Sequence, residues 1–395
     1  MKFPVYLDHN ATTPCDPQVL EMMLPWFVER FGNASSIHHP YGWVAENAVE
    51  IAREQLADLI RATPKEIFFT SGATEAINLG IRGVMEANSA IGNHLITVET
   101  EHKAVLDTCK VLEQSGIEVT YLPVNKEGLI DLHELEGNIR PETVMIIVMM
   151  ANNETGLIQP IQEIGSLAKS HGLIFLSDAV QAAGKIPIDV KNLGIDLMPI
   201  SAHKMYGPKG VGALFISPKI SIVSQITGGG QEGGLRSGTL NVPGIVGFGV
   251  AAKIAQQQMF TEQTRLGKLR DILERSLLEI EGTHLNGHFE RRLPHVSHIS
   301  FEGVKGKDLL LAVNKELAVS SGSACASSFT STPSHVLKAM GVGDELATSS
   351  LRFGLGRSTT ESQVEFSVHF VKKTVLALRK KGSWGYKVSN TIFNE

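Results

Sequence analysis

The sequence predicts an α/β fold in which a mostly parallel central sheet is accompanied by a smaller α+β domain at the C-terminal end. Between residues 45 and 255, short apolar runs alternate with stretches of helical periodicity. This alternation is typical of βαβ units with helices on both faces of a sheet. At 395 residues the chain is also too long for one compact core, so two domains are expected.

Seven apolar runs are the candidate strands of this sheet. The most apolar of them, residues 144–150, is far shorter than the ~20 residues of a membrane span. Its uninterrupted apolar character is typical of a strand that is buried on both faces. The candidate strands are residues 66–70, 94–98, 118–122, 144–150, 173–176, 197–200 and 211–216.

An apolar stripe marks the start of the C-terminal part. Residues 259–280 have leucines and an isoleucine at helical spacing, which predicts a long amphipathic helix. We place a domain boundary before it, with a large domain over residues 15–258 and a small domain formed by residues 1–14 and 259–395. The Gly-rich stretch 227–239 is expected to be a loop between the two. The stripe consists of Leu266, Leu269, Leu273, Leu277 and Ile280.

Composition narrows the class of protein. A net charge of -5 and a pI near 6.3 argue against direct nucleic-acid binding, which favours a basic surface. No apolar segment is long enough for the membrane, and the N-terminus lacks a secretory core, so we expect a cytoplasmic protein. The three cysteines fit neither a zinc site nor a disulfide framework. Cys15 and Cys109 are interpreted as structural, and no metal is expected.

Lys204 is the first candidate functional residue. It follows the candidate strand 197–200, with Ser201 and His203 just before it and a Gly-rich turn after it. A lysine amine at a strand end in a partly desolvated pocket can lose its proton and form a Schiff base. Pyridoxal 5'-phosphate (PLP) is held in this way and then serves as an electron sink. Most lysines are solvated, so this prediction depends on the residues that accompany Lys204.

Polar residues follow the other strands, and in a parallel sheet these positions meet at the ligand-binding edge. Asp178 is placed to pair with the pyridinium nitrogen of PLP, and Gln181 to donate to its phenolic oxygen. His102 is placed to stack on the ring and to act in acid–base steps. Taken alone, Asp178 is equally well explained as a helix N-cap, and His102 as a surface or capping residue.

The stretch 68–76 has the order of a strand, a glycine turn and a helix start. The free N–H groups and the positive dipole end of such a helix favour an anion. We therefore expect a phosphate cradle at Ala73 and Thr74. Helix capping by Ser71 or Thr74 explains the same residues.

Two further candidates lie in the C-terminal part. Cys325 belongs to the small, polar stretch 320–328, and a cysteine on such a loop is available as a nucleophile. Arg352 carries a guanidinium fork that suits bidentate binding of an α-carboxylate. The simpler alternatives are an incidental surface thiol and a structural ion pair.

Together these segments resemble the NifS/IscS-like cysteine desulfurases, in the class V aminotransferase group of fold-type I PLP enzymes. Residues 320–325, which end at Cys325, favour the NifS/IscS-like branch of the cysteine desulfurases. Ala34 stands where the family usually has proline, and His9 where asparagine is common; neither removes a catalytic group. The matching segments are residues 6–14, 32–38, 70–76, 101–102, 152–156, 178–181, 201–204, 236–239, 320–328 and 351–357.

The resemblance implies conversion of L-cysteine to L-alanine, with the sulfur taken as a persulfide on Cys325. Lys204 would bind PLP and move the Cα proton of the substrate. Arg352 would orient the substrate carboxylate together with Asn153 and Asn33. The persulfide sulfur would then pass to an acceptor protein, either an iron–sulfur scaffold or a thiolation enzyme.

The resemblance also implies how the phosphate is held. Thr74, Ser201 and His203 would bind it within the subunit. Thr239 would reach the phosphate of the partner subunit, which implies an obligate homodimer.

Three other functions remain open. A selenocysteine lyase acts on a substrate that differs by one atom, so the sequence does not exclude it. Another class V PLP reaction, such as transamination, needs no thiol, and Cys325 argues against it. A non-catalytic docking subunit has no need for Lys204, Asp178 and His102, and failure to bind PLP would favour it.

Overall fold

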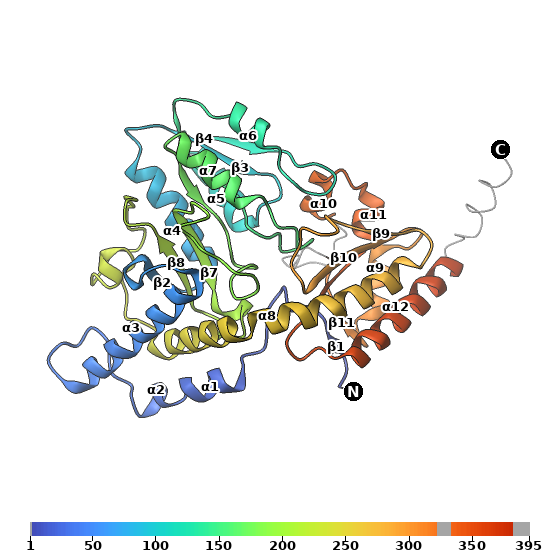
Figure 1. Ribbon diagram of the computed structural model, residues 1–395, viewed down its shortest axis with the longest axis horizontal. Coiled ribbons are helices and arrows are strands. Elements are labelled where there is room, and N and C mark those ends of the chain that lie inside the picture. Colours follow the sequence, from blue (N-terminus) through green and yellow to red (C-terminus); the bar gives the residue numbers. More distant parts are fainter. Residues whose placement is uncertain (1, 322–332, 382–395) are drawn as a thin grey trace.

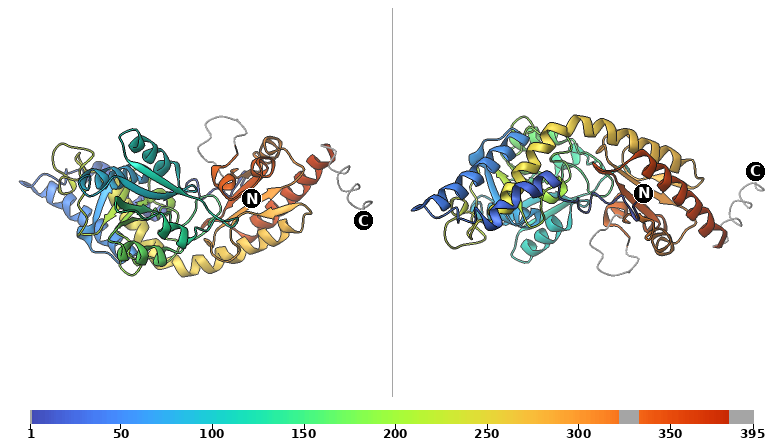
Figure 2. Two further views of the ribbon diagram at one scale, coloured as in Figure 1. Left: turned by 90° about the horizontal axis from the view of Figure 1, so that it is seen from above. Right: turned by 90° about the horizontal axis from the view of Figure 1, so that it is seen from below.

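The computed structural model describes residues 2–321 and 333–381 of the chain. Figure 1 shows two lobes, and helix α8 (Val242–Leu278) runs along both. The views from above and below in Figure 2 show the same elongated arrangement. The larger lobe contains the central sheet, and the smaller lobe combines the N-terminal strand with the C-terminal elements.

The central sheet has seven strands in the order β2-β8-β7-β6-β5-β3-β4. Strands β4, β3, β5, β6 and β7 run parallel, and β8 is antiparallel to both of its neighbours. The predicted mostly parallel sheet is therefore confirmed, and each candidate strand forms. The strands are β2 (Ile67–Thr70), β3 (His94–Val98), β4 (Glu118–Leu122), β5 (Thr143–Ile147), β6 (Ile174–Leu176), β7 (Leu197–Ser201) and β8 (Gly212–Ile216).

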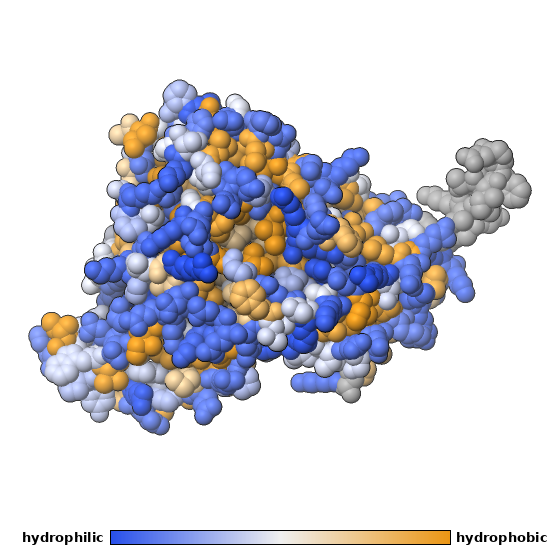
Figure 3. Space-filling view, in the orientation of Figure 1, coloured by the Kyte–Doolittle hydropathy of each residue, from blue (hydrophilic) through white to orange (hydrophobic). Residues whose placement is uncertain are grey.

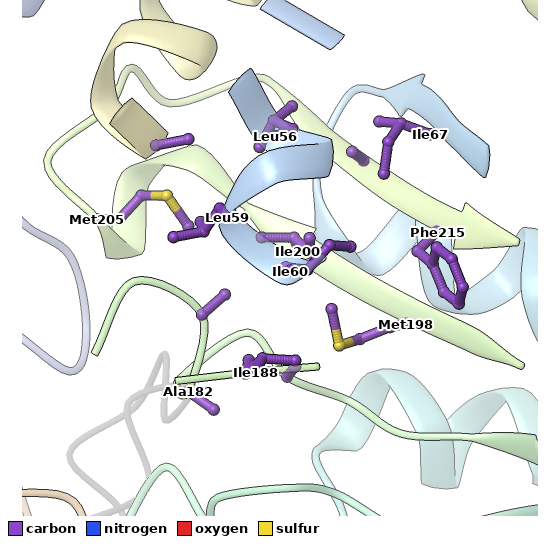
Figure 4. Packing of buried hydrophobic residues seen from close by; sticks show 14 of the residues in the cluster. Leu56, Leu59, Ile60, Ile67, Ala182, Ile188, Met198, Ile200, Met205 and Phe215 are labelled. Atoms are coloured by element: carbon purple, nitrogen blue, oxygen red, sulfur yellow. The ribbon is translucent and has the colours of Figure 1, made fainter. Parts of the chain in front are cut away.

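Helices cover both faces of this sheet. Alternate strand residues point to opposite faces, so Leu197 joins the core beneath α4, whereas Met198 and Ile200 join the core beneath α3. Figure 4 shows Ile200 close to Ile60 of α3 in the second of these cores, which also contains Phe215 and Leu56. The helices are α1 (Pro17–Met23), α2 (Pro25–Val28), α3 (Pro40–Ile60), α4 (Ala73–Ala87), α5 (Lys103–Glu113), α6 (Leu132–Gly137) and α7 (Ile161–Ser170).

The smaller lobe has its own hydrophobic core. The N-terminal residues Val5 and Leu7 pack there with the apolar stripe of α8 and with later elements such as β10. An antiparallel sheet of order β12-β10-β9 and a parallel pair β1-β11 form its strands. The elements are β1 (Val5–Tyr6), β9 (Thr283–Leu285), β10 (Val296–Phe301), α9 (Gly306–Val313), β11 (Leu317–Ala318), α10 (His335–Ala339), α11 (Asp344–Thr348), β12 (Ser350–Gly354) and α12 (Glu361–Lys381).

Helix α8 begins earlier than the sequence predicts. The expected helix starts at residue 259, whereas α8 starts at Val242. Its first three turns, residues 242–252, include no exposed residue and lie against α3, where a Cβ on Gly249 would come within 2.6 Å of Cα of Ala52. A helix buried on several sides shows no apolar stripe, which is why the pattern is visible only from Leu266 onward. The domain boundary at residue 258 falls inside this helix and remains a prediction.

Short 3-10 helices complete the described elements: η1 (Pro64–Glu66), η2 (Ala202–Lys204) and η3 (Glu232–Gly234). Of the helices in the described ranges, none combines the length and the apolar character needed to cross a membrane.

Candidate active site

A cavity of about 640 Å³ lies at the carboxyl ends of the parallel strands. It is lined from both lobes, because α4 and β7 contribute from the larger lobe and β12 from the smaller. The predicted site residues that line it are Ala73, Thr74, His102, Asn153, Asp178, Gln181, Ser201, His203, Lys204 and Arg352.

Lys204 ends the 3-10 turn η2, directly after β7. Its Nζ donates to the backbone carbonyls of Asn10 at 2.5 Å and Ala11 at 2.7 Å. Gln181 also donates to the Asn10 carbonyl, through Nε2 at 3.0 Å. The N-terminal segment between the lobes therefore holds the lysine amine. No side-chain pattern could have predicted these contacts, because both acceptors are backbone atoms.

Asp178 follows β6 and is buried. Its Oδ1 accepts a hydrogen bond from the Val180 N–H at 2.9 Å. The carboxylate therefore caps a turn, whereas the alternative interpretation from the sequence was that it caps a helix. Burial raises the pKa of Asp178, whereas His102 and Lys204 act in the opposite direction. Asp178 therefore interacts electrostatically both with His102, the predicted acid–base residue, and with Lys204, the predicted Schiff-base residue.

His102 is the N-cap of α5, which agrees with the alternative interpretation of this residue as a capping residue. It also lines the cavity. Its Nδ1 accepts the Ala104 N–H at 3.1 Å, so in the neutral ring the proton lies on Nε2. Burial lowers the pKa of His102, although the Asp178 carboxylate favours the charged ring. The ring is therefore neutral at pH 7.

The predicted phosphate cradle lies at the start of α4. Gly72 is the N-cap, with no side-chain capping bond, so capping does not account for Ser71 and Thr74. A Cβ on Gly72 would meet no other atom within 4 Å, which shows open space at this turn. His203 bonds through Nδ1 to Oγ1 of Thr12 at 3.1 Å, and burial lowers its pKa to about 4.

Arg352 lies on β12 and is almost fully buried. Its Nη1 donates to the Asn153 carbonyl at 2.9 Å, and its Nη2 pairs with Oδ1 of Asp8 at 2.8 Å. The structural ion pair that the sequence left open therefore exists, in a side chain that also lines the cavity.

Three predicted residues are not among those that line the cavity. Asn33 and Thr239 are exposed, and Oδ1 of Asn33 accepts the Ser35 N–H at 2.9 Å. Cys325 lies outside the residues that the structure describes. The roles of all three remain predictions.

Glu154 and His335, for which no role was predicted, also line the cavity. Oε2 of Glu154 accepts the Ser334 hydroxyl at 2.5 Å, and Nε2 of His335 donates to the Glu101 carbonyl at 2.9 Å. These bonds hold the start of α10 against the larger lobe. Glu154 belongs to the segment 152–156 that resembles the family, whereas nothing in the sequence indicated His335.

The fold and the cavity define the class of protein, an α/β protein of the fold-type I architecture with a lysine at the end of a sheet strand. The chain belongs to the aminotransferase class-V family, whose model matches residues 5–366.

The similar proteins cover nearly the whole chain. The cysteine desulfurase IscS of Methylococcus capsulatus is 53% identical over 382 residues, which are 96% of this chain and 94% of that protein. A solved structure of a NifS-like protein is 38% identical with a TM-score of 0.87, over 95% of this chain and 99% of the other. The structure of SspA in complex with cysteine is also 38% identical, with a TM-score of 0.78 over 89% of this chain and 98% of the other.

Proposed function

We propose that this protein is a PLP-dependent cysteine desulfurase, which converts L-cysteine to L-alanine and takes the sulfur onto Cys325 as a persulfide. The observation that carries the proposal is one cavity lined by Lys204, Asp178 and His102 from the larger lobe and Arg352 from the smaller. The 53% identity to a cysteine desulfurase over 96% of the chain supports the same reaction.

The donor groups of the cavity fit PLP. Lys204 would hold the cofactor through its amine, and the buried Asp178 carboxylate would keep the ring nitrogen protonated. The open turn at Gly72 leaves room for a phosphate beside the first N–H groups of α4. When bound, PLP supplies an electron sink for the bond that breaks in the substrate. The other residues that would hold the cofactor are Ala73, Thr74, Gln181, Ser201, His203 and Asn153.

Arg352 would bind the carboxylate of L-cysteine. A guanidinium binds a carboxylate with two parallel hydrogen bonds, and this one lies at the cavity wall beside Asn153. The α-carbon of the substrate would then lie on the side of the cavity where Lys204 and His102 stand. Asn33 is the third residue proposed to assist this orientation.

Two residues would move protons. Lys204 would take the proton from the substrate Cα, since its amine lies at the strand end inside the cavity. His102 is neutral because burial lowers its pKa, so it would accept a proton from the substrate thiol. The Cys325 thiolate would then attack the substrate sulfur. The C–S bond breaks with its electron pair on carbon, an S–S bond forms, and protonation of carbon gives L-alanine without an external oxidant.

The sulfur would leave on a partner protein. The thiolate of an acceptor cysteine can attack the outer sulfur of the persulfide, so that a new S–S bond forms on the acceptor and Cys325 leaves as a thiolate. We propose an acceptor of the iron–sulfur scaffold or thiolation type, as the resemblance to the NifS/IscS-like cysteine desulfurases implies.

We also propose a homodimer, because a belt of exposed apolar side chains covers the region of α1 to α3. Monomers rarely expose so many large apolar side chains together. Figure 3 shows several orange residues over this part of the larger lobe, at the lower left. Thr239 is exposed on the Gly-rich loop, where a partner's cavity could receive it. The belt consists of Leu20, Met22, Leu24, Phe27, Val28, Phe31, Ile37, Tyr41, Trp43, Val44 and Ile51.

The test is anaerobic incubation of the purified protein with PLP, L-cysteine and a reductant. We expect alanine and sulfide in equal amounts, and neither from Lys204→Ala. Alanine formed only in the presence of a keto acid would instead indicate transamination. Faster turnover with selenocysteine, by an order of magnitude or more, would indicate a selenocysteine lyase.

Sedimentation velocity tests the proposed homodimer, and Phe31→Glu should yield monomers.

A further inference from the structure

An acidic residue stands where the proposed phosphate would bind. Glu75 is the third residue of α4 and lines the cavity beside Ala73 and Thr74. A carboxylate in the first turn stabilises a helix, but the same negative charge repels a phosphate at that helix end. The proposed cradle therefore requires something that compensates Glu75.

Arg236 supplies this compensation. Its Nε lies 2.7 Å from Oε1 of Glu75, and its Nη2 lies 3.3 Å from Oε2. The Ser71 N–H donates to Oε2 at 2.9 Å, so the carboxylate reaches back to the turn just before the helix and is held there. Burial alone would raise the pKa of Glu75, but the hydrogen bonds from Arg236 and Ser71 lower it. The pair is ionised at pH 7.

The loop that carries Arg236 is fixed independently. The Ser237 N–H donates to the Ile226 carbonyl at 3.0 Å. Glu232 pairs with Arg53 at 2.8 Å and accepts the Phe69 N–H of β2 at 2.6 Å. The Gly-rich loop 227–239 is thus anchored on the strand that leads into the cradle. Arg236 is not among the residues that line the cavity, and Glu75, with which it is paired, connects it to the cavity wall.

We propose that Arg236 is a positioning residue for the cofactor phosphate, which neutralises and orients Glu75 so that the start of α4 accepts a dianion. This inference rests on the proposed function, since it assumes that the PLP phosphate binds at α4. It assigns a role to an ion pair between the cradle and the Gly-rich loop that presents Thr239.

The test compares PLP with pyridoxal, which lacks the phosphate, by absorbance titration of the cofactor-free protein. Arg236→Gln should weaken PLP binding roughly 10- to 100-fold, because the Glu75 carboxylate is then uncompensated. Pyridoxal binding should change less than about threefold. Glu75→Gln combined with Arg236→Gln should bind PLP within about threefold of wild type, since both charges are gone. Arg140→Gln, which breaks the exposed pair with Glu118, is the matched control.

Three results would overturn the inference: unchanged PLP affinity in Arg236→Gln, an equal loss for pyridoxal, or no recovery in the double variant. The last two would indicate that the pair only supports the local fold. Failure of the wild-type protein to bind PLP at all would instead refute the proposed function, so the two failures are distinguishable.

Discussion

The guanidinium of Arg352 is paired with the carboxylate of Asp8, with Nη2 and Oδ1 2.8 Å apart. The two residues lie 344 positions apart in the chain and meet because the segment after β1 forms a parallel bridge from Asp8 to Gly354 at the end of β12. The other arm of the guanidinium bonds to the Asn153 carbonyl of the larger lobe. Asp8 therefore fixes the orientation of the proposed carboxylate-binding residue.

Asp8→Asn is expected to raise KM for L-cysteine about tenfold and to change kcat much less, because the guanidinium loses its charged partner and its fixed orientation. Steady-state kinetics of alanine release measure both constants. An unchanged KM, or an equal fall in kcat and kcat/KM, would show that Asp8 does not position Arg352 for substrate binding.

The stability of the protein should fall in mild acid, in part through His9. Burial lowers the pKa of His9 to about 4, although its bond to the Gly354 carbonyl opposes this. Below the usual pKa of about 6.5 the unfolded chain binds a proton that the folded chain does not, so the free energy of unfolding decreases by about 1.4 kcal/mol per pH unit. Between pH 8 and pH 5, wild type should lose about 2 kcal/mol more than His9→Asn. Urea unfolding at both pH values measures this, and parallel losses would contradict it.

Gly212 should be required for the shape of the cradle. A Cβ there would lie 2.7 Å from C and Cα of Gly72 and 2.8 Å from the Ile200 carbonyl oxygen. Gly212→Ala must therefore shift backbone at the start of α4, which we expect to weaken PLP binding about tenfold and to cost about 1–3 kcal/mol of unfolding free energy.

Gly267→Ala is the matched control, since a Cβ at this position of α8 would meet no atom within 4 Å. It should raise the unfolding free energy by about 0.5–1 kcal/mol and leave PLP titration unchanged. If Gly212→Ala behaves like this control, the close approach of β8 to the cradle is not required for PLP binding.

The ion pair between Arg292 and Glu274 should stabilise the attachment of α8. Both side chains are 2% exposed, and Ser297 also donates to the carboxylate at 2.8 Å. Arg292→Met leaves a buried unpaired carboxylate and should cost about 3 kcal/mol in urea unfolding. Adding Glu274→Leu should recover part of this loss. A double variant with a lower free energy of unfolding than Arg292→Met would contradict the explanation.

The sequence predicted the strands well because their signal is local. Each apolar run from β2 to β8 reports its own burial, and the polar residues behind these runs meet because the carboxyl ends of parallel strands share one edge. Lys204, Asp178 and His102 therefore line one cavity, and their roles remain predictions. The predicted start of α8 was wrong because residues 242–252 include no exposed residue, and so no exposed face against which an apolar stripe could be recognised.

The pairs that tune the site could not be predicted from local patterns. Arg236 and Glu75 are 161 positions apart, and the pairing appears only when the Gly-rich loop folds back onto β2. The acceptors of Lys204 are backbone carbonyls of Asn10 and Ala11, which every sequence offers equally. Such contacts depend on the tertiary path of the chain and not on residue type.

The most direct test of the central claim follows the sulfur atom itself. The PLP-loaded protein is mixed with one equivalent of L-cysteine without reductant, quenched rapidly and analysed by peptide mass spectrometry, with alanine quantified in parallel. We predict one added sulfur atom on the peptide that contains Cys325, in the same amount as alanine, and no added sulfur in Cys325→Ser. Alanine formation with the sulfur on another residue would refute the role of Cys325, and no alanine from the PLP-loaded protein would contradict the proposed desulfurase.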